Sequence, residues 1–205
     1  MEKRDLDIIT NGVVNWRMYL DSTVLITGVT GRLGRYILET LADMDIKYNL
    51  NMRLLGLARS EEKARDVFDN LLDFPNVGFL YQDVNIPIKY EGRIDYIFHT
   101  AGPAAPRDYD TPTETLWAHV NGMECARTHQ TKRVFYVSTV ETYGEWKSDA
   151  KIKETDMGIM RHLNSRACYP EAKRLCETML ATYKQEYGIS FCGVRLCHTL
   201  GPGVS

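Results

Sequence analysis

The sequence of 205 residues predicts an α/β domain built on a parallel, doubly wound sheet. An apolar segment at 23–27 leads into a glycine-rich turn at 27–34, and a stretch with helical spacing of apolar residues follows it. Short apolar segments and longer amphipathic segments then alternate along the chain. Strands that alternate with helices form parallel sheets through right-handed crossovers. The length suits one well-buried domain, which is expected to span residues 21–205.

Each element follows from a local pattern. Apolar segments bounded by polar residues or glycine predict strands at 23–27, 52–57, 77–81, 94–99, 134–138 and 191–196. Helical spacing of apolar side chains predicts helices at 32–44, 61–72, 113–128 and 167–187. Residues 1–20 form an N-terminal extension, either a helix packed on the sheet or an arm. In such a fold ligands are expected at the carboxyl edge of the sheet.

The composition argues against several classes of partner. The 25 Lys and Arg residues are scattered among 27 Asp and Glu residues, which disfavours nucleic-acid binding. No apolar segment is long enough to span a membrane, and the charged N-terminus does not resemble a signal peptide, so a cytoplasmic protein is expected. The five cysteines form an odd set without CxxC pairs or His/Cys metal spacing, which favours reduced thiols and no bound metal.

The glycine-rich turn predicts a site for the pyrophosphate of a dinucleotide. It follows a strand and opens a helix, so amide groups of the first helical turn can hold the phosphates. Three glycines alone are also typical of ordinary turns, and the position between strand and helix favours binding. The residues expected at the cofactor are Gly28, Thr30, Gly31, Arg32, Leu33 and Gly34.

The ends of the second and third strands bear on the adenosine half of the cofactor. An acid after the second strand would bind the ribose of NAD, whereas this chain has Arg59, which can meet the 2′-phosphate of NADP together with Arg32. A solvated arginine at a helix start is an equal alternative. Asp83 and Val84 can approach the adenine, although an ordinary loop aspartate is nearly as well supported.

Small residues follow the fourth strand. Thr100, Ala101 and Gly102 would let the backbone pass close to the cofactor, so they are expected to contact it. His99 ends the strand just before them, and a histidine in that position is more often packed in the core than used as a base.

Four polar residues predict an acid–base group. Tyr169 and Lys173 lie four residues apart in a predicted helix, so they share one face and the ammonium can favour the phenolate. Because a free tyrosine titrates at about pH 10, the positive nicotinamide ring of an oxidised cofactor would have to help the lysine. Thr139 can hydrogen-bond a substrate hydroxyl, and Glu141 can be a second acid or base. Taken alone, the latter two are better explained by strand-end polarity and capping.

Together these segments resemble the extended short-chain dehydrogenase/reductase superfamily, and within it the NAD-dependent epimerase/dehydratase family that remodels nucleotide sugars. The resemblance covers about residues 23–205 and rests on four ordered motifs, TGVTGRLG, HTAGPAA, STVETYG and YPEAK. The segments HTAGPAAPRDY and RACYPEAK are most similar to those of UDP-glucuronate decarboxylases. The resemblance implies a Rossmann-type fold, an NAD or NADP cofactor and a UDP-sugar substrate.

The resemblance also assigns roles to individual residues. Thr139 matches the catalytic hydroxyl, Tyr169 the base, and Lys173 its partner, which also touches the nicotinamide ribose. Glu141 matches the glutamate of decarboxylases and 4,6-dehydratases, and Asn121 matches a structural asparagine.

Three departures from the family pattern limit these expectations. Val140 stands where dehydratases carry an aspartate, so dehydration is disfavoured. His198 stands where many relatives place an asparagine on the nucleotide-sugar phosphate, and it is expected to bind substrate in its place. Relatives continue into a C-terminal substrate lobe, whereas this chain ends at Ser205, so the fold is expected to be truncated before that lobe.

Several functions stay open at this point. The resemblance implies oxidation of a sugar 4′-hydroxyl to a transient ketone and then loss of carbon dioxide from a glucuronate, with a 4-epimerase or dehydratase as the alternative. A dinucleotide-binding fragment without turnover is a second class, and an NADP-linked reductase of small carbonyls, which explains Glu141 poorly, is a third. In relatives two long helices form a dimer interface, and the segments 113–128 and 167–187 match them, so a homodimer is expected.

Overall fold

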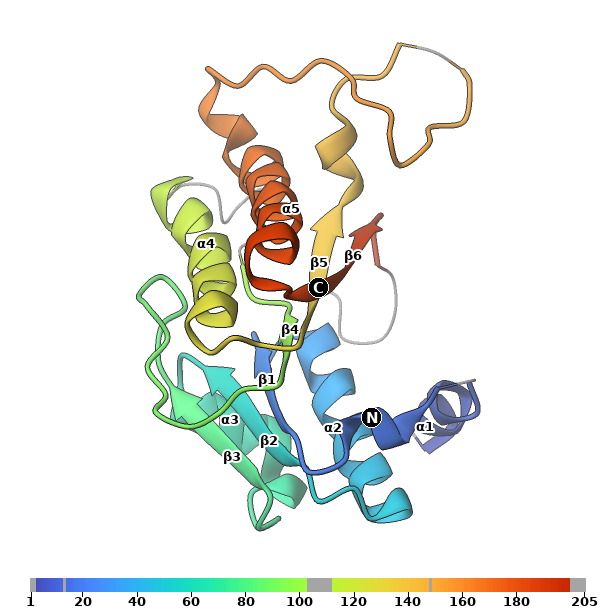
Figure 1. Ribbon diagram of the computed structural model, residues 1–205, viewed down its shortest axis with the longest axis vertical. Coiled ribbons are helices and arrows are strands. Elements are labelled where there is room, and N and C mark those ends of the chain that lie inside the picture. Colours follow the sequence, from blue (N-terminus) through green and yellow to red (C-terminus); the bar gives the residue numbers. More distant parts are fainter. Residues whose placement is uncertain (1–2, 13, 103–111, 148, 200–205) are drawn as a thin grey trace.

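The computed structural model describes residues 3–12, 14–102, 112–147 and 149–199 (Figure 1). One sheet of six strands has the order β3-β2-β1-β4-β5-β6, and all neighbouring strands are parallel. The strands are β1 (Thr23–Thr27), β2 (Arg53–Ala58), β3 (Val77–Tyr81), β4 (Tyr96–His99), β5 (Arg133–Thr139) and β6 (Ser190–Leu196). The strand order reverses direction at β1, so the sheet is doubly wound and the predicted Rossmann-type fold is confirmed.

The helices between the strands match the predicted ones, with differences at their ends. They are α2 (Arg32–Tyr48), α3 (Glu61–Phe68), α4 (Pro112–Thr128) and α5 (Cys168–Tyr187). α2 continues beyond the predicted end at 44 and stops where Asn49 adopts a left-handed conformation with a φ of 50°. α3 is shorter than predicted, because Phe68 is buried in the core and the chain continues from it as the 3-10 helix η2 (Asp69–Leu71).

Helices cover both faces of the sheet (Figure 1), and a cluster of buried side chains fills the space on each face. Successive strand residues point to opposite faces, so Leu25 joins the cluster beneath α4 and α5, whereas Ile26 joins the cluster beneath α2 and α3. Tyr136 of β5 is fully buried in the first cluster. This cluster includes Cys176, Leu180 and Tyr183 of α5, and Tyr136 extends it to Lys173, whose Nζ lies 4.9 Å from the centre of the Tyr136 ring.

The described residues among the first twenty pack against the domain, α1 against α2 and η1 at the amino ends of the strands. In α1 (Lys3–Thr10), Asp5 accepts a hydrogen bond of 2.8 Å from the hydroxyl of Tyr36 in α2. The 3-10 helix η1 (Trp16–Tyr19) lies beside the start of β4, where the Tyr96 hydroxyl donates to the Met18 carbonyl oxygen at 2.8 Å. The described part of this segment is therefore packed, with α1 against α2 rather than on the sheet.

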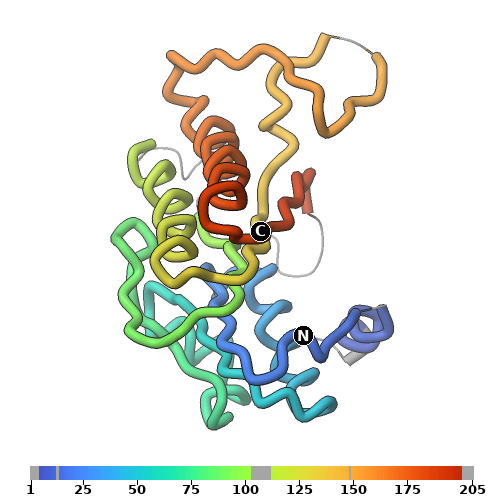
Figure 2. Tube along the Cα trace, viewed as in Figure 1, coloured from blue at the N-terminus to red at the C-terminus, as the bar shows by residue number. Residues whose placement is uncertain are grey.

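A long loop follows β5 on the side of the molecule opposite to this N-terminal segment (Figure 2). The chain leaves β5 through the 3-10 helix η4 (Val140–Tyr143) and returns to α5 through a second one, η5 (Ser165–Ala167). Glu145 and Ile159 form an antiparallel bridge that ties the two sides of the loop together. Within the described residues, no helix is both long enough and apolar enough to cross a membrane.

Candidate active site

Three segments that are far apart in the sequence meet at the carboxyl edge of the sheet. β1, β4 and β5 are neighbours, so the residues that follow them lie side by side. The Thr100 hydroxyl donates to the Thr27 carbonyl oxygen at 2.7 Å, and the Ala101 N–H donates to the Thr27 hydroxyl at 3.2 Å. These bonds hold the end of β4 against the glycine turn. The rest of the HTAGPAAPRDY motif, at 103–109, lies outside the described residues.

The turn after β1 is built for close approach of a ligand to the backbone. Gly28 has a φ of 67°, and a Cβ there would lie 2.8 Å from the Ala101 backbone. A Cβ on Gly34 would collide with the Gly28 carbonyl oxygen. The N-terminus of α2 has Gly31 at its cap and no side-chain capping bond, so the first-turn amide groups face the turn. Thr30, Arg32 and Leu33 are partly exposed around it. This cradle suits a pyrophosphate.

The residues expected near the adenosine differ in their surroundings. Arg59 is exposed just past the end of β2. The Asp83 carboxylate accepts a hydrogen bond of 2.8 Å from the Asn85 N–H, which fixes the turn after β3. Buried Asn121 donates to the Val84 carbonyl oxygen at 2.9 Å and thus ties α4 to that turn. The role of Asn121 in the described structure is therefore to hold the loop.

Tyr169 lies in the first turn of α5, against the end of β5. Its side chain is buried, and the Thr139 side chain acts on its hydroxyl and lowers its pKa. The Thr139 hydroxyl also accepts from the Glu141 N–H at 3.3 Å. Burial raises the pKa of Tyr169 and outweighs the lowering by the Thr139 hydrogen bond and the Arg166 charge; the charge of Glu141 raises it further. The surroundings of Tyr169 therefore raise its pKa, whereas the sequence predicts that Lys173 lowers it.

Lys173 lies one helical turn beyond Tyr169 and is 4% exposed. Its Nζ donates to the Val137 carbonyl oxygen at 2.5 Å and lies 5.6 Å from the centre of the Tyr169 ring and 4.9 Å from that of Tyr136. The expected placement beneath Tyr169 is thus found. Burial lowers the pKa of Lys173 to about 7, because the ammonium has left water for the space between two rings. A lysine with this pKa is only partly protonated at neutral pH, which weakens its action on the tyrosine.

Two buried histidines lie behind this pair, and one of them was not expected there. The His99 ring is hydrogen-bonded through Nδ1 to the Thr27 hydroxyl at 2.8 Å, and burial lowers its pKa to about 3, as suits a packed histidine. His119 of α4 is fully buried, with its ring 6.1 Å from that of Tyr169. A Cβ on Gly102 would collide with that ring, so the glycine at this position makes room for His119.

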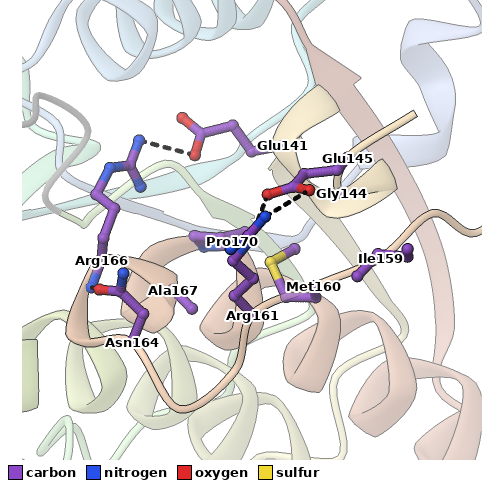
Figure 3. Close-up of a pocket in the computed structure, with 10 residues that line it drawn as sticks. All are labelled: Glu141, Gly144, Glu145, Ile159, Met160, Arg161, Asn164, Arg166, Ala167 and Pro170. Atoms are coloured by element: carbon purple, nitrogen blue, oxygen red, sulfur yellow. Dashed lines mark hydrogen bonds and ion pairs between the residues drawn. The ribbon is translucent and has the colours of Figure 1, made fainter. Parts of the chain in front are cut away.

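Glu141 points into a cavity of about 380 Å³ beside Tyr169, shown in Figure 3. An ion pair of 3.0 Å joins its Oε2 to Nη2 of Arg166, in η5. The cavity is lined by Glu141, Gly144, Glu145, Ile159, Met160, Arg161, Asn164, Arg166, Ala167 and Pro170. Ala167 and Pro170 place the cavity beside the start of α5, the helix that carries Tyr169, although the Tyr169 side chain is not among the lining residues.

A second network supports the base from the other side of β5. The Ser138 hydroxyl donates to Glu177 of α5 at 2.5 Å, and Arg195 of β6 donates to the same carboxylate through Nε at 3.0 Å and Nη2 at 2.6 Å. Arg195 therefore fastens the last strand to the helix that carries Tyr169. His198 is exposed two residues past the end of β6 and is not among the cavity residues.

Sequence reasoning gave no role to Arg166 or His119. Arg166 precedes Tyr169 by three residues, and a guanidinium one turn before a predicted base on a helix is a signal that could have been used. His119 gives no such signal, because its neighbours become apparent only when α4 packs beside α5. Thr139, Glu141, Tyr169 and Lys173, by contrast, are brought together as expected.

The glycine cradle and the neighbouring tyrosine, lysine and threonine define a dinucleotide-binding α/β domain equipped for acid–base chemistry. The class can be stated more narrowly by comparison with known proteins. Residues 24–205 match the model of the NAD dependent epimerase/dehydratase family, and the chain belongs to this family. A nicotinamide dinucleotide is accordingly its class of cofactor.

Similar proteins carry related names. The chain is 27% identical over 183 residues to UDP-glucuronic acid decarboxylase 5 of Arabidopsis thaliana, and the aligned region covers 87% of this chain and 51% of that protein. It is 28% identical over 187 residues to UDP-glucuronic acid decarboxylase 1 of Xenopus tropicalis, covering 87% and 41%. The chain thus spans about half the length, or less, of these relatives.

Solved structures share the fold. A dTDP-glucose 4,6-dehydratase from Streptomyces venezuelae, with NAD bound, superposes with a TM-score of 0.69 at 22% identity, covering 88% of this chain and 57% of that one. A UDP-N-acetylglucosamine 4-epimerase from Methanobrevibacter ruminantium gives 0.67 at 20% identity, covering 86% and 55%.

Proposed function

We propose that this protein modifies a nucleotide sugar through a transient 4-keto intermediate, and that its reaction is the decarboxylation of UDP-glucuronate. The observation that carries the proposal is the joining of Tyr169 and Thr139 at the carboxyl edge, with Glu141 in the adjoining cavity. The names of the relatives, which are UDP-glucuronic acid decarboxylases, support the choice of substrate.

In the proposed reaction each residue has a separate task. Tyr169 takes the proton of the 4′-hydroxyl, and Thr139, which acts on the Tyr169 hydroxyl, holds the same oxygen. When bound, a nicotinamide dinucleotide supplies the reversible oxidation of a sugar hydroxyl to a ketone. Lys173 holds the ring of Tyr169 from below and is available to a neighbouring hydroxyl. The glycine turn at 27–34 holds the pyrophosphate.

The ketone makes decarboxylation possible. In a glucuronate it stands beta to the carboxylate, so the electron pair of the breaking carbon–carbon bond moves into the carbonyl and gives an enolate as carbon dioxide leaves. A proton then returns to carbon, and the ketone is reduced to the hydroxyl. Glu141 is the acid or base of the cavity that is closest in sequence to Thr139 and is proposed to assist this proton transfer.

The first experiment is an assay of the gene product, from its complete reading frame, with UDP-glucuronate. Release of carbon dioxide together with a UDP-pentose is expected. A 4-epimerase, the alternative, would give UDP-galacturonate without gas, and that product alone would rule out decarboxylation. Dehydration is disfavoured because Val140, between Thr139 and Glu141, cannot protonate a leaving hydroxyl.

We propose NAD as the cofactor, on the strength of the family, although exposed Arg59 could accept a 2′-phosphate. Titration with NAD and NADP decides. If NADP binds more tightly and Arg59→Ala removes that preference, NADP is the cofactor. Tight binding of either dinucleotide without turnover on any nucleotide sugar would favour the second candidate, a binding protein, which the partial coverage of the relatives motivates.

We also propose that the protein forms a homodimer through α4 and α5, in the reducing environment of the cytoplasm. Exposed apolar side chains lie on both helices: Leu116 and Trp117 on α4, and Leu175 and Tyr187 on α5. All five cysteines are free thiols, which is consistent with that compartment.

A further inference from the structure

Two arginine–glutamate pairs line the cavity beside Tyr169 (Figure 3). Arg161 pairs with Glu145 at 2.8 Å, and both side chains are largely exposed, at 75% and 49%. Arg166 pairs with Glu141 at 3.0 Å, and these side chains are less exposed, at 48% and 40%. The second pair involves the carboxylate that follows Thr139, so it stands next to the reacting groups.

The backbone fixes the place of Arg166. Asn164 caps η5, and its side-chain oxygen accepts a hydrogen bond of 3.0 Å from the Arg166 N–H. η5 runs without interruption into α5, so Arg166 precedes Tyr169 by one turn. Thr139 and Lys173 are buried, whereas Glu141 and Arg166 are partly exposed and line the cavity.

We propose that Arg166 determines the preference of this site for a sugar that carries a carboxylate, by keeping Glu141 in an ion pair at the cavity wall. The inference rests on the proposed nucleotide-sugar function and names the class of sugar within it. Arg166 acts through Glu141 and is a positioning and specificity-determining residue rather than a catalytic one.

The argument is one of charge balance. A carboxylate on the substrate that enters this cavity comes near the carboxylate of Glu141, and these like charges repel each other, although water at this partly exposed site weakens the repulsion. The guanidinium of Arg166 cancels the charge of Glu141, so an anionic sugar can enter. A neutral sugar needs no such compensation and gains little from it.

The same pair also acts on the base. Among the residues that the structure describes, the charged groups that face Tyr169 are Glu141 from η4, Arg166 from η5 and Lys173 from α5, while His119 from α4 is kept neutral by burial. Glu141 raises the pKa of Tyr169 and Arg166 lowers it. Removal of Arg166 therefore leaves an unopposed carboxylate beside both the base and the substrate.

Two ligands that differ only at C6 separate this role from a structural one. UDP-glucuronate carries a carboxylate where UDP-glucose carries a hydroxymethyl group. In the complete gene product, Arg166→Gln is expected to weaken binding of UDP-glucuronate at least tenfold and that of UDP-glucose less than threefold, by calorimetric titration. Arg161→Gln removes the same charge from the same cavity without touching Glu141, and it is expected to leave the ratio of the two dissociation constants within twofold.

A double variant tests the mechanism. In Glu141→Gln combined with Arg166→Gln the repelling charge is gone, so the affinity for UDP-glucuronate is expected to return to within threefold of the wild type. Arg166→Lys keeps a cation and is expected to retain most of the preference. Circular dichroism shows whether each variant is folded. If Arg166→Gln does not fold, Arg166→Lys supplies the test, because loss of the preference in that folded variant would contradict the proposal.

Several results would overturn the proposal. They are an equal loss of affinity for both sugars, an equal shift of the ratio in Arg161→Gln, no recovery in the double variant, or a wild type without preference between the two sugars. One further result is expected: because Arg166 lowers the pKa of Tyr169, the pH at which kcat/KM rises should be higher in Arg166→Gln than in the wild type. Absence of carbon dioxide release by the wild type would defeat the proposed reaction but not this inference, because the binding ratio is measured without turnover.

Discussion

At Tyr169 and Lys173, burial and charge act against each other. Burial raises the pKa of the tyrosine and lowers that of the lysine to about 7, so the surroundings of both residues favour their neutral forms. The buried rings of Tyr136 and His119 make up part of these surroundings. Turnover therefore requires cations close to the phenol to shift it toward the phenolate.

Tyr169→Phe is expected to reduce turnover of UDP-glucuronate by about 10²–10⁴-fold, because the general base is lost. Dinucleotide binding should change little, since the glycine turn holds the pyrophosphate. Carbon dioxide release and a dinucleotide titration on the same sample check both parts. A variant that keeps the wild-type rate would show that Tyr169 is not the base.

Lys173→Met is expected to change how stability depends on pH. Below about pH 7 the wild-type lysine is protonated in both the folded and unfolded chain, and the folded chain bears the full cost of the buried ammonium. Between there and about pH 10.5 the unfolded chain binds more protons, so wild-type stability rises with pH by up to about 1.4 kcal/mol per unit. The methionine variant lacks this rise.

Urea unfolding at pH 6 to 9 measures the difference, and the advantage of the variant should shrink as pH increases. Lys184→Met, at an exposed position of the same helix, is the matched control and should give a constant difference. A constant difference for Lys173→Met as well would show that the ammonium is not destabilised by burial.

At the scale of elements, the contact between β1 and α2 depends on glycine. Gly34→Ala would place a Cβ 2.7 Å from the Cα of Val29 as well as against the Gly28 carbonyl. Better helix propensity contributes only about 1 kcal/mol, whereas overpacking against backbone costs about 1–3 kcal/mol and displaces the turn. The variant is therefore expected to be less stable and to bind dinucleotide more weakly.

Thermal unfolding and dinucleotide titration check this expectation. Gly193→Ala is the control, since a Cβ at this exposed position of β6 meets no atom within 4 Å of the described chain, and its stability should stay within about 0.5 kcal/mol of the wild type. Equal stability and affinity of the two variants would contradict the role of Gly34.

Much of the arrangement of elements could be predicted from the sequence, and the failures have physical reasons. The strand at 77–81 agrees with β3 at both ends, because apolar residues are sharply bounded there. The helix predicted to 72 stops at Phe68, because burial of that ring turns the chain into a 3-10 helix. Propensity alone does not reveal such an anchor.

The candidate site could likewise be predicted only in part from the sequence. Tyr169 and Lys173 could be paired from their spacing, since a helix places such residues on one face. The pair Arg166–Glu141 joins residues 25 positions apart across a loop without periodicity, so the sequence offered no basis for it. The pKa of Lys173 was equally out of reach, because it depends on rings from β5 and α5 that only the fold brings together.

For the whole molecule, the proposed dimer is the property most open to test. Trp117 is 53% exposed on α4, and Leu175 is 47% exposed on α5. Trp117→Glu is expected to shift the protein toward monomer, because a carboxylate would have to be buried in an apolar interface. Sedimentation velocity measures the change.

Ile46→Glu, which alters a 62% exposed side chain on α2, is the matched control and should leave the association state unchanged. A wild-type protein that sediments as a monomer at all concentrations, or a dimer that tolerates both substitutions, would contradict the proposed interface.

The position of η1 has a practical consequence for following the protein in solution. Trp16 packs against the core at the amino ends of the strands, whereas the candidate site lies at their carboxyl ends. Its indole emission should therefore report the unfolding of the sheet while remaining insensitive to ligand at the opposite edge. With the other tryptophans replaced by phenylalanine, Trp16 becomes an internal fluorescent gauge of folding that can be read during ligand titrations.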